Sequence, residues 1–213
     1  MQESRNLYIM LSRTGTGMGK LIRLFTRSTY NHVSLTFDPF YRCFVSFARY
    51  TQGVALAGGF VTESAQRFLC AEQPVPVRIF RVEITQERYE QLTALFSIAE
   101  TKNPLIYNSL GALLSTWHLR CHIPASYTCL EFAAAVLGKP FRSLQELQAY
   151  LQPYEIFQGN LNDLVQNNGD RSDLFFTHRG FLRGTADTVV HFTRLLGRLL
   201  RICRCDDPIA ALE

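Results

Sequence analysis

One cysteine in this chain stands where a thiol can become reactive. Cys129 follows Thr128 and precedes the apolar run Phe132 to Leu137. Thr128 followed three residues later by Glu131 is a capping-box pattern, which makes Thr128 the expected N-cap and places Cys129 in the first turn of a helix. The unpaired N–H groups and the dipole of a helix N-terminus stabilise a thiolate. The sequence therefore predicts a nucleophile if a base can reach it, and an inert core thiol is the alternative.

The base for such a thiol would be an imidazole that first helps to form the thiolate and later protonates the leaving group. His32 opens an alternating, β-branched segment that is typical of a strand, directly after turn-like residues 28–31. A side chain at the start of a strand can reach a helix N-terminus across a core. We therefore expect His32 to be the base, with a purely structural histidine as the alternative. The other candidates are His118, His122, His178 and His191.

The remaining pattern predicts a mixture of strands and helices that would position these two residues. Gly58 and Gly59 are expected to break the chain between two elements. Strands are expected at Leu7–Leu11, His32–Phe37, Cys43–Phe47, Val54–Leu56 and Val75–Val82. Helical spacing is expected around Leu21–Phe25 and at Glu63–Leu69, Gln86–Thr101, Ser109–Thr116, Cys129–Gly138, Ser143–Leu151 and Leu161–Gln166.

The order of these elements resembles the permuted NlpC-type branch of the papain-like cysteine hydrolases, in which the histidine strand precedes the cysteine helix. The matching segments are residues 26–35 and 127–137, and residues 107–111 are similar to a segment that precedes the cysteine helix in some of these proteins. The likeness spans roughly Leu7 to Gly138. It implies an α+β, papain-like fold with a small antiparallel sheet packed against helices.

The resemblance also implies an acyl-transfer reaction without a cofactor. Cys129 would attack an amide or ester carbonyl, His32 would act as base and then as acid, and the backbone N–H of Cys129 or a neighbour would bind the oxyanion. The third polar residue comes from the returning strand in this family, and Ser46 is the only polar side chain in the middle of that stretch. A hydroxyl can orient an imidazole but stabilises its charged form less than a carboxylate does. Tyr107 and Tyr127 are the expected substrate-binding residues.

Three functions are compatible with these residues. A cysteine hydrolase acting as a peptidase or amidase is the first expectation. An acyltransferase or thioesterase that acts on lipid esters is the second, because lecithin–retinol acyltransferase-like proteins are similar in their permuted order. A catalytically silent binding module is the third, and the weak third residue Ser46 motivates it.

The end of the chain differs in composition from the rest. Arginine recurs through the last residues, and Val189 to Ile202 follow an amphipathic helical pattern with arginines on the second face. We expect a catalytic domain at 1–168 and a basic amphipathic extension at 169–213. The amphipathic helix either packs on the domain or makes a peripheral contact with a membrane surface.

Composition excludes several other classes. A net charge of +4 gives no general signal of nucleic-acid binding, and no stretch is as long and apolar as a membrane-spanning helix. The first residues lack the pattern of a signal peptide, so a cytoplasmic protein with free thiols is expected. The pair Cys203/Cys205 lacks the partners of a zinc site, and Gly15, Gly17 and Gly19 lack phosphate-loop spacing. The sequence gives no prediction of oligomeric state.

Overall fold

The computed structural model describes residues 4–14, 29–54, 56–70, 73–102, 105–114, 119, 121–200 and 207–212. Several features singled out in the sequence lie outside the described residues. These are the glycines at 15, 17 and 19, the helical pattern at 21–25, His118 and the pair Cys203/Cys205.

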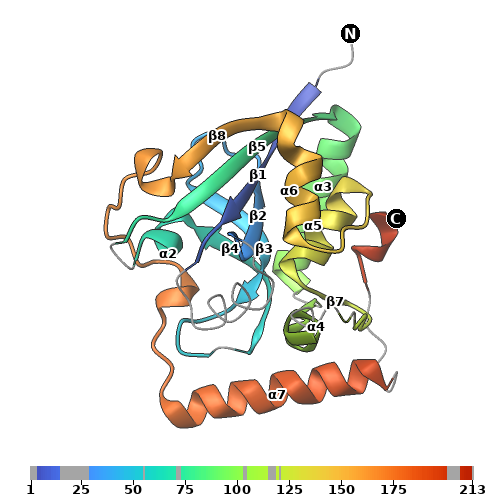
Figure 1. Cartoon of the computed structure of the whole chain (residues 1–213). Helices are drawn as coiled ribbons and strands as arrows, with labels where there is room; N and C mark the ends of the chain where they lie inside the picture. Colours follow the sequence, from blue (N-terminus) through green and yellow to red (C-terminus); the bar gives the residue numbers. More distant parts are fainter. Residues whose placement is uncertain are drawn as a thin grey trace.

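A single sheet forms the centre of the described part of the chain (Figure 1). Its eight strands follow the order β7-β6-β4-β3-β2-β1-β5-β8, and all neighbours are antiparallel except β6 and β7, which are parallel. The expected small antiparallel sheet is thus larger and mixed. The strands are β1 Ser4–Ser12, β2 His32–Thr36, β3 Cys43–Arg49, β4 Gly58–Ser64, β5 Pro76–Thr85, β6 Ile106–Tyr107, β7 Ser126–Tyr127 and β8 Glu155–Asn160.

Helices cover the sheet unequally, and the expected α+β class is confirmed. Helices α3, α5 and α6 lie on one face, α2 lies on the other side, and α7 runs along one end of the domain (Figure 1). No helix of the described residues is long and apolar enough to cross a bilayer. The helices are α2 Ala65–Leu69, α3 Gln86–Lys102, α4 Ser109–Leu114, α5 Cys129–Leu137, α6 Leu144–Leu151 and α7 Phe181–Leu199. Short 3-10 turns occupy Gln152–Tyr154, Leu161–Asp163, Leu174–Phe176 and Ala210–Leu212.

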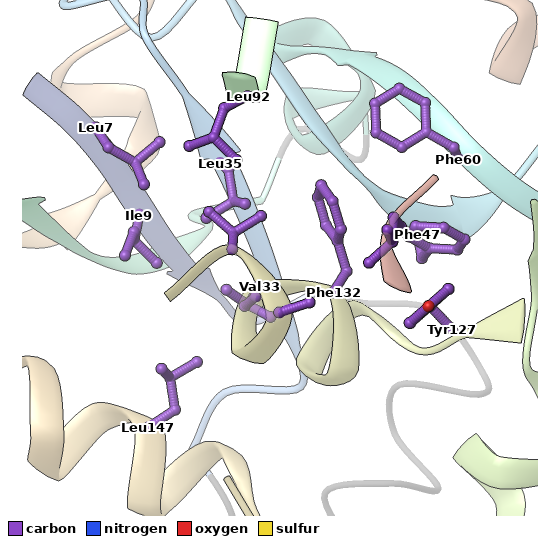
Figure 2. Packing of buried hydrophobic residues seen from close by; sticks show 14 of the residues in the cluster. Leu7, Ile9, Val33, Leu35, Phe47, Phe60, Leu92, Tyr127, Phe132 and Leu147 are labelled. Atoms are coloured by element: carbon purple, nitrogen blue, oxygen red, sulfur yellow. The ribbon is translucent and has the colours of Figure 1, made fainter. Parts of the chain in front are cut away.

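The main core lies between the sheet and helices α3, α5 and α6. Alternate strand residues point into it because successive side chains of a strand lie on opposite faces. Phe132 of α5 lies at its centre, with its ring centroid 5.3 Å from that of Phe47 and 5.7 Å from that of Phe60. Figure 2 shows Phe132 among these side chains. This packing fixes the first turn of α5 against the sheet.

A second, smaller core lies on the other face of the sheet. Met10 and Phe44 reach it from β1 and β3, and Phe68 and Leu69 reach it from α2. The two cores use opposite faces of the same strands, so β1, β3 and β5 are held from both sides. Because these strands are buried on both faces, their register is fixed, and side chains at the strand ends are held in place.

The clearest departure from the expected elements concerns β4. Val54 and Leu56 belong to no strand, whereas Gly58 and Gly59 open β4 instead of breaking the chain. A Cβ atom at Gly58 would lie 2.2 Å from the carbonyl oxygen of Ala48, and one at Gly59 would lie 2.2 Å from the hydroxyl oxygen of Tyr50. Glycine is present here because neighbouring groups approach the backbone closely. The strand then continues to Ser64, past the start of the expected helix.

Most other expectations are confirmed. Strands β1, β2, β3 and β5 and helices α3, α5 and α6 lie where the pattern placed them, with small changes at their ends. The helix expected at Leu161–Gln166 is only a 3-10 turn, Leu161–Asp163. Strand β8, with the polar sequence Glu155–Asn160, was not expected, because its pairing with β5 is a tertiary contact.

The basic amphipathic extension expected at 169–213 makes several contacts with the rest of the domain. Asp173 accepts hydrogen bonds from the backbone N–H and the hydroxyl of Ser64, at the end of β4. Arg198 donates to the carbonyl of Ala125, and Asp207 accepts from the N–H of Ala125 and the hydroxyl of Tyr127. The C-terminal segment therefore supports β4 and the chain that enters α5.

Candidate active site

The first turn of α5 carries Cys129 as the sequence predicts. The Thr128 hydroxyl accepts a hydrogen bond from the N–H of Glu131, and the Glu131 carboxylate accepts one from the N–H of Thr128. The helix ends at Gly138, whose φ of 62° is the left-handed conformation that glycine adopts easily. Cys129 is partly exposed at the beginning of the helix. The N–H groups of the first turn other than that of Glu131 have no acceptor within the helix.

We expect Thr128→Ala to lower the free energy of unfolding by about 1 kcal/mol, because one N-cap hydrogen bond is lost. The same change should slow the alkylation of Cys129, since the first turn frays and its N–H groups no longer stabilise the thiolate. Urea unfolding and iodoacetamide labelling measure the two effects. Ser143→Ala is the matched control, because Ser143 caps α6 in the same way through the N–H of Glu146. It should cost similar stability and leave Cys129 alkylation unchanged; equal slowing in both variants would contradict the prediction.

His32, at the start of β2, lies beside this helix turn. Its backbone pairs with Ser12 of β1, and the preceding Asn31 exchanges hydrogen bonds with the backbone and hydroxyl of Thr14. The ring is buried and lies close enough to the side chain of Cys129 for that thiol to help raise its pKa. The fold thus brings together the two residues that the sequence singled out, from a strand and a helix far apart in the chain.

The far side of the imidazole is bound by a carboxylate that the sequence analysis missed. The Nε2 atom of His32 lies 2.9 Å from Oε2 of Glu63, which projects from β4. The Ser46 hydroxyl donates to the same oxygen at 2.6 Å. Ser46 was expected to orient the ring itself; it instead orients Glu63, which takes that place. Since Nε2 is engaged, Nδ1 is the ring nitrogen that can exchange a proton with the sulfur.

Glu63 is itself held by a buried cation. The Nε atom of Arg67, one helical turn further along the chain, lies 3.6 Å from Oε1 of Glu63. Arg67 also donates to the carbonyl of Arg49, and its guanidinium lies 4.4 Å from the centroid of the Phe175 ring. Arg67 and Phe175 are both buried. The C-terminal segment therefore closes over the group that fixes the carboxylate.

These contacts change the ionisation of the pair. Burial lowers the pKa of His32, but the charge of Glu63 and the hydrogen bonds to Cys129 and Glu63 outweigh it and raise that pKa from 6.5 to about 10. Burial raises the pKa of Glu63, but His32, Arg67 and the hydrogen bond from Ser46 lower it from 4.5 to about 2. At neutral pH the His32 ring beside this sulfur is therefore an imidazolium.

The two expected substrate-binding tyrosines differ in their surroundings. Burial and the negative charges of Cys129 and Glu131 raise the pKa of Tyr107, so its phenol stays protonated near the sulfur. Tyr127 is buried in the core with its ring against Phe47, and its hydroxyl donates to Asp207. Tyr107 can donate a hydrogen bond near the reacting thiol, whereas the contacts of Tyr127 are those of a core residue.

The other described histidines have different environments. His122 and His178 are exposed, and His191 is buried on α7 with its Nε2 atom 2.9 Å from the carbonyl oxygen of Tyr107. Within the described residues, no group of three or more His, Cys, Asp and Glu side chains is arranged to hold a metal ion. His32 is therefore the imidazole that the described structure places beside Cys129.

Comparison with known proteins gave no match: no family model, no curated protein and no solved structure is similar to this chain at a significant level. The functional argument therefore depends on the geometry of the Cys129, His32 and Glu63 side chains.

Proposed function

We propose that this protein is a cysteine hydrolase, a peptidase or amidase of the papain-like, permuted NlpC type, that transfers an acyl group to water. One observation carries the proposal. A single buried imidazole contacts a thiol at a helix N-terminus on one side and a buried carboxylate on the other. This is the nucleophile, base and orienting group of cysteine acyl transfer, recognised by geometry and role.

The reaction begins with the charged pair that the site favours. The Cys129 thiolate attacks the carbonyl carbon, a C–S bond forms, and the π electrons move to the oxygen. The N–H of Cys129 and the phenol of Tyr107 are the donors available to that oxyanion. Collapse of the intermediate expels the amine or alcohol, which takes the proton of His32. The neutral ring then removes a proton from water, and the resulting hydroxide releases the acid and the free thiolate.

This order of proton transfers differs in one respect from the expectation that His32 acts first as a base. With a pKa near 10, the ring already holds the proton at neutral pH and serves first as an acid. Glu63 stabilises that charge, as a serine hydroxyl alone would not. The hypothesis of a catalytically silent module was based on Ser46 as a weak third residue. Because the carboxylate of Glu63 takes that place, this reason no longer applies. A lipid ester stays the second candidate substrate, because α7 carries exposed apolar side chains such as Val189 and Leu196.

Alkylation tests the reactive thiol. We expect iodoacetamide at neutral pH to modify Cys129 about tenfold or more faster than Cys43, because thiolate content controls the rate. Cys43 is the internal control: it is an exposed residue, yet partial burial of its thiol and the charges of Asp173 and Glu100 raise its pKa. Mass spectrometry of peptides after timed labelling measures both rates in one sample. A Cys129 that reacts no faster than Cys43 would sink the proposal.

Hydrolysis tests the proposed step itself. A panel of peptide anilides, simple amides and nitrophenyl esters is offered to the wild type, Cys129→Ala and Cys43→Ala. Turnover that is lost in Cys129→Ala and kept in Cys43→Ala supports the proposal and ranks amides against esters. Turnover that survives in Cys129→Ala contradicts it.

A further inference from the structure

Helix α7 is attached to the domain by its polar side. His191, Leu195 and Arg198 are its buried residues, at 4%, 2% and 6% exposure. His191 bonds the carbonyl of Tyr107, and Arg198 bonds the carbonyl of Ala125. Leu195 packs on Ile106 in a small apolar cluster beside α4. An amphipathic helix usually covers a core with its apolar face. Helix α7 instead contacts the domain mainly through its polar side.

The opposite face of α7 is apolar and exposed. Its large side chains recur at helical spacing, so they form one stripe along the helix. Phe181 and Leu182 are 87% and 83% exposed, and Val189 and Leu196 are 61% and 54% exposed. We call this stripe the outer face of α7; its members are Phe181, Leu182, Val189, Phe192, Leu196 and Leu199, with Leu200 just after the helix.

The exposed charges of α7 lie outside this stripe, on the polar side of the helix, and most of them are positive. Arg183 and Arg194 are exposed. Asp187 is the only acidic residue in Phe181–Leu199, and it forms an ion pair with Arg179 at 3.9 Å. An apolar stripe combined with a basic polar side matches the acyl chains and the anionic headgroups of a lipid surface.

We propose that the outer face of α7 binds the surface of a bilayer that contains anionic lipids, with the helix lying in the plane of the interface. The helix runs along one end of the domain, where it is exposed along its length (Figure 1). Its inner side bonds the backbone of Tyr107, whose phenol is coupled to the charge of Cys129. The helix proposed to bind the bilayer therefore contacts the backbone of a residue that lies near the thiol. This proposal does not depend on the acyl-transfer activity.

Sedimentation with vesicles tests the proposal. Vesicles of phosphatidylcholine mixed with phosphatidylglycerol should bind the full chain at low salt, and pure phosphatidylcholine should bind it less. Val189→Asn/Leu196→Asn should reduce binding by about tenfold or more, since apolar burial drives interfacial binding. Phe40→Asn/Ile156→Asn is the matched control, because both residues are exposed and lie outside α7. It should bind as the wild type does.

Charge and oligomeric state complete the test. Arg183→Gln/Arg194→Gln should remove the preference for the anionic vesicles, and added salt should do the same for the wild type. Wild-type protein that stays in the supernatant with both vesicle types at low salt overturns the proposal. The proposal is also overturned if sedimentation velocity shows a dimer that Val189→Asn/Leu196→Asn dissociates and the protein does not bind vesicles. Cys129→Ala should bind as the wild type does, so a failure of the hydrolase proposal is distinguishable from a failure of this one.

Discussion

Glu63→Gln is expected to slow hydrolysis by about a hundredfold or more, because His32 loses the carboxylate that keeps its ring charged at neutral pH. The amide keeps the size of the carboxylate but removes the negative charge that raises the pKa of His32. Burial of the ring remains, and burial alone lowers that pKa. The pKa of His32 should therefore fall in the variant, so that less of the ring is charged beside the sulfur. Steady-state rates on the best substrate of the panel measure the loss.

The same variant also has a structural cost. Arg67 is buried against Phe175 and keeps its charge when Glu63 becomes neutral. Removing one partner of a buried ion pair costs about 3–5 kcal/mol, so the variant should unfold at lower urea concentration. Rates must therefore be compared under conditions in which circular dichroism shows both proteins to be folded.

A control separates charge from the hydrogen-bond network. Ser46→Ala removes the 2.6 Å hydrogen bond to Glu63 but leaves the carboxylate on the ring. It should cost about 1 kcal/mol of stability and only a small part of the rate. NMR titration of the His32 ring protons gives the decisive readout. If Glu63→Gln leaves the His32 titration and the rate unchanged, Glu63 has no role in setting the charge of the pair.

The helix start at Cys129 could be predicted because its signals are local. The capping box needs only Thr128 and Glu131, and both hydrogen bonds form within one helical turn. The alternation that begins at His32 is likewise contained in one strand, so its position at a strand start could be predicted as well. The pairing of Cys129 with His32 was predicted from their order in the chain, through the family resemblance, and not from any local pattern.

Glu63 could not be found in this way because its strand is defined by tertiary contacts. Gly58 and Gly59 have low strand propensity, and only the close approach of Ala48 and Tyr50 explains them. The apolar residues from Ala65 onward then favoured a helix that appeared to include Glu63. A weak signal was present, since Phe60 to Thr62 are aromatic or β-branched residues, which favour a strand.

Helix α7 illustrates a second limit. Its amphipathic pattern could be predicted, but the pattern does not say which face docks. The polar face docks because His191 and Arg198 form hydrogen bonds with the backbone carbonyls of Tyr107 and Ala125. No sequence pattern indicates these acceptors. The apolar face is left exposed along the helix.

The second large effect concerns pH, and its sign follows from the two shifts. The folded-state pKa of His32 is raised from 6.5 to about 10, so its contribution to stability is complete below pH 6.5 and is lost as pH rises through 10. The folded-state pKa of Glu63 is lowered from 4.5 to about 2, so its contribution is present above pH 4.5 and is lost as pH falls through 2. Together they should stabilise the fold most between pH 4.5 and 6.5.

Hydrolysis should keep its acid catalyst up to higher pH than an ordinary histidine allows. The rate is expected to fall only as pH approaches about 10, where His32 loses its proton. Urea unfolding and initial rates at a series of pH values measure both limits. In His32→Gln the loss of stability between pH 6.5 and 10 should be much smaller, because the titrating ring is gone. His122→Gln, at an exposed histidine, should keep the wild-type slope. A wild-type stability that is flat across that range, or an identical slope in His32→Gln, would show that the ring is not charged in the folded protein.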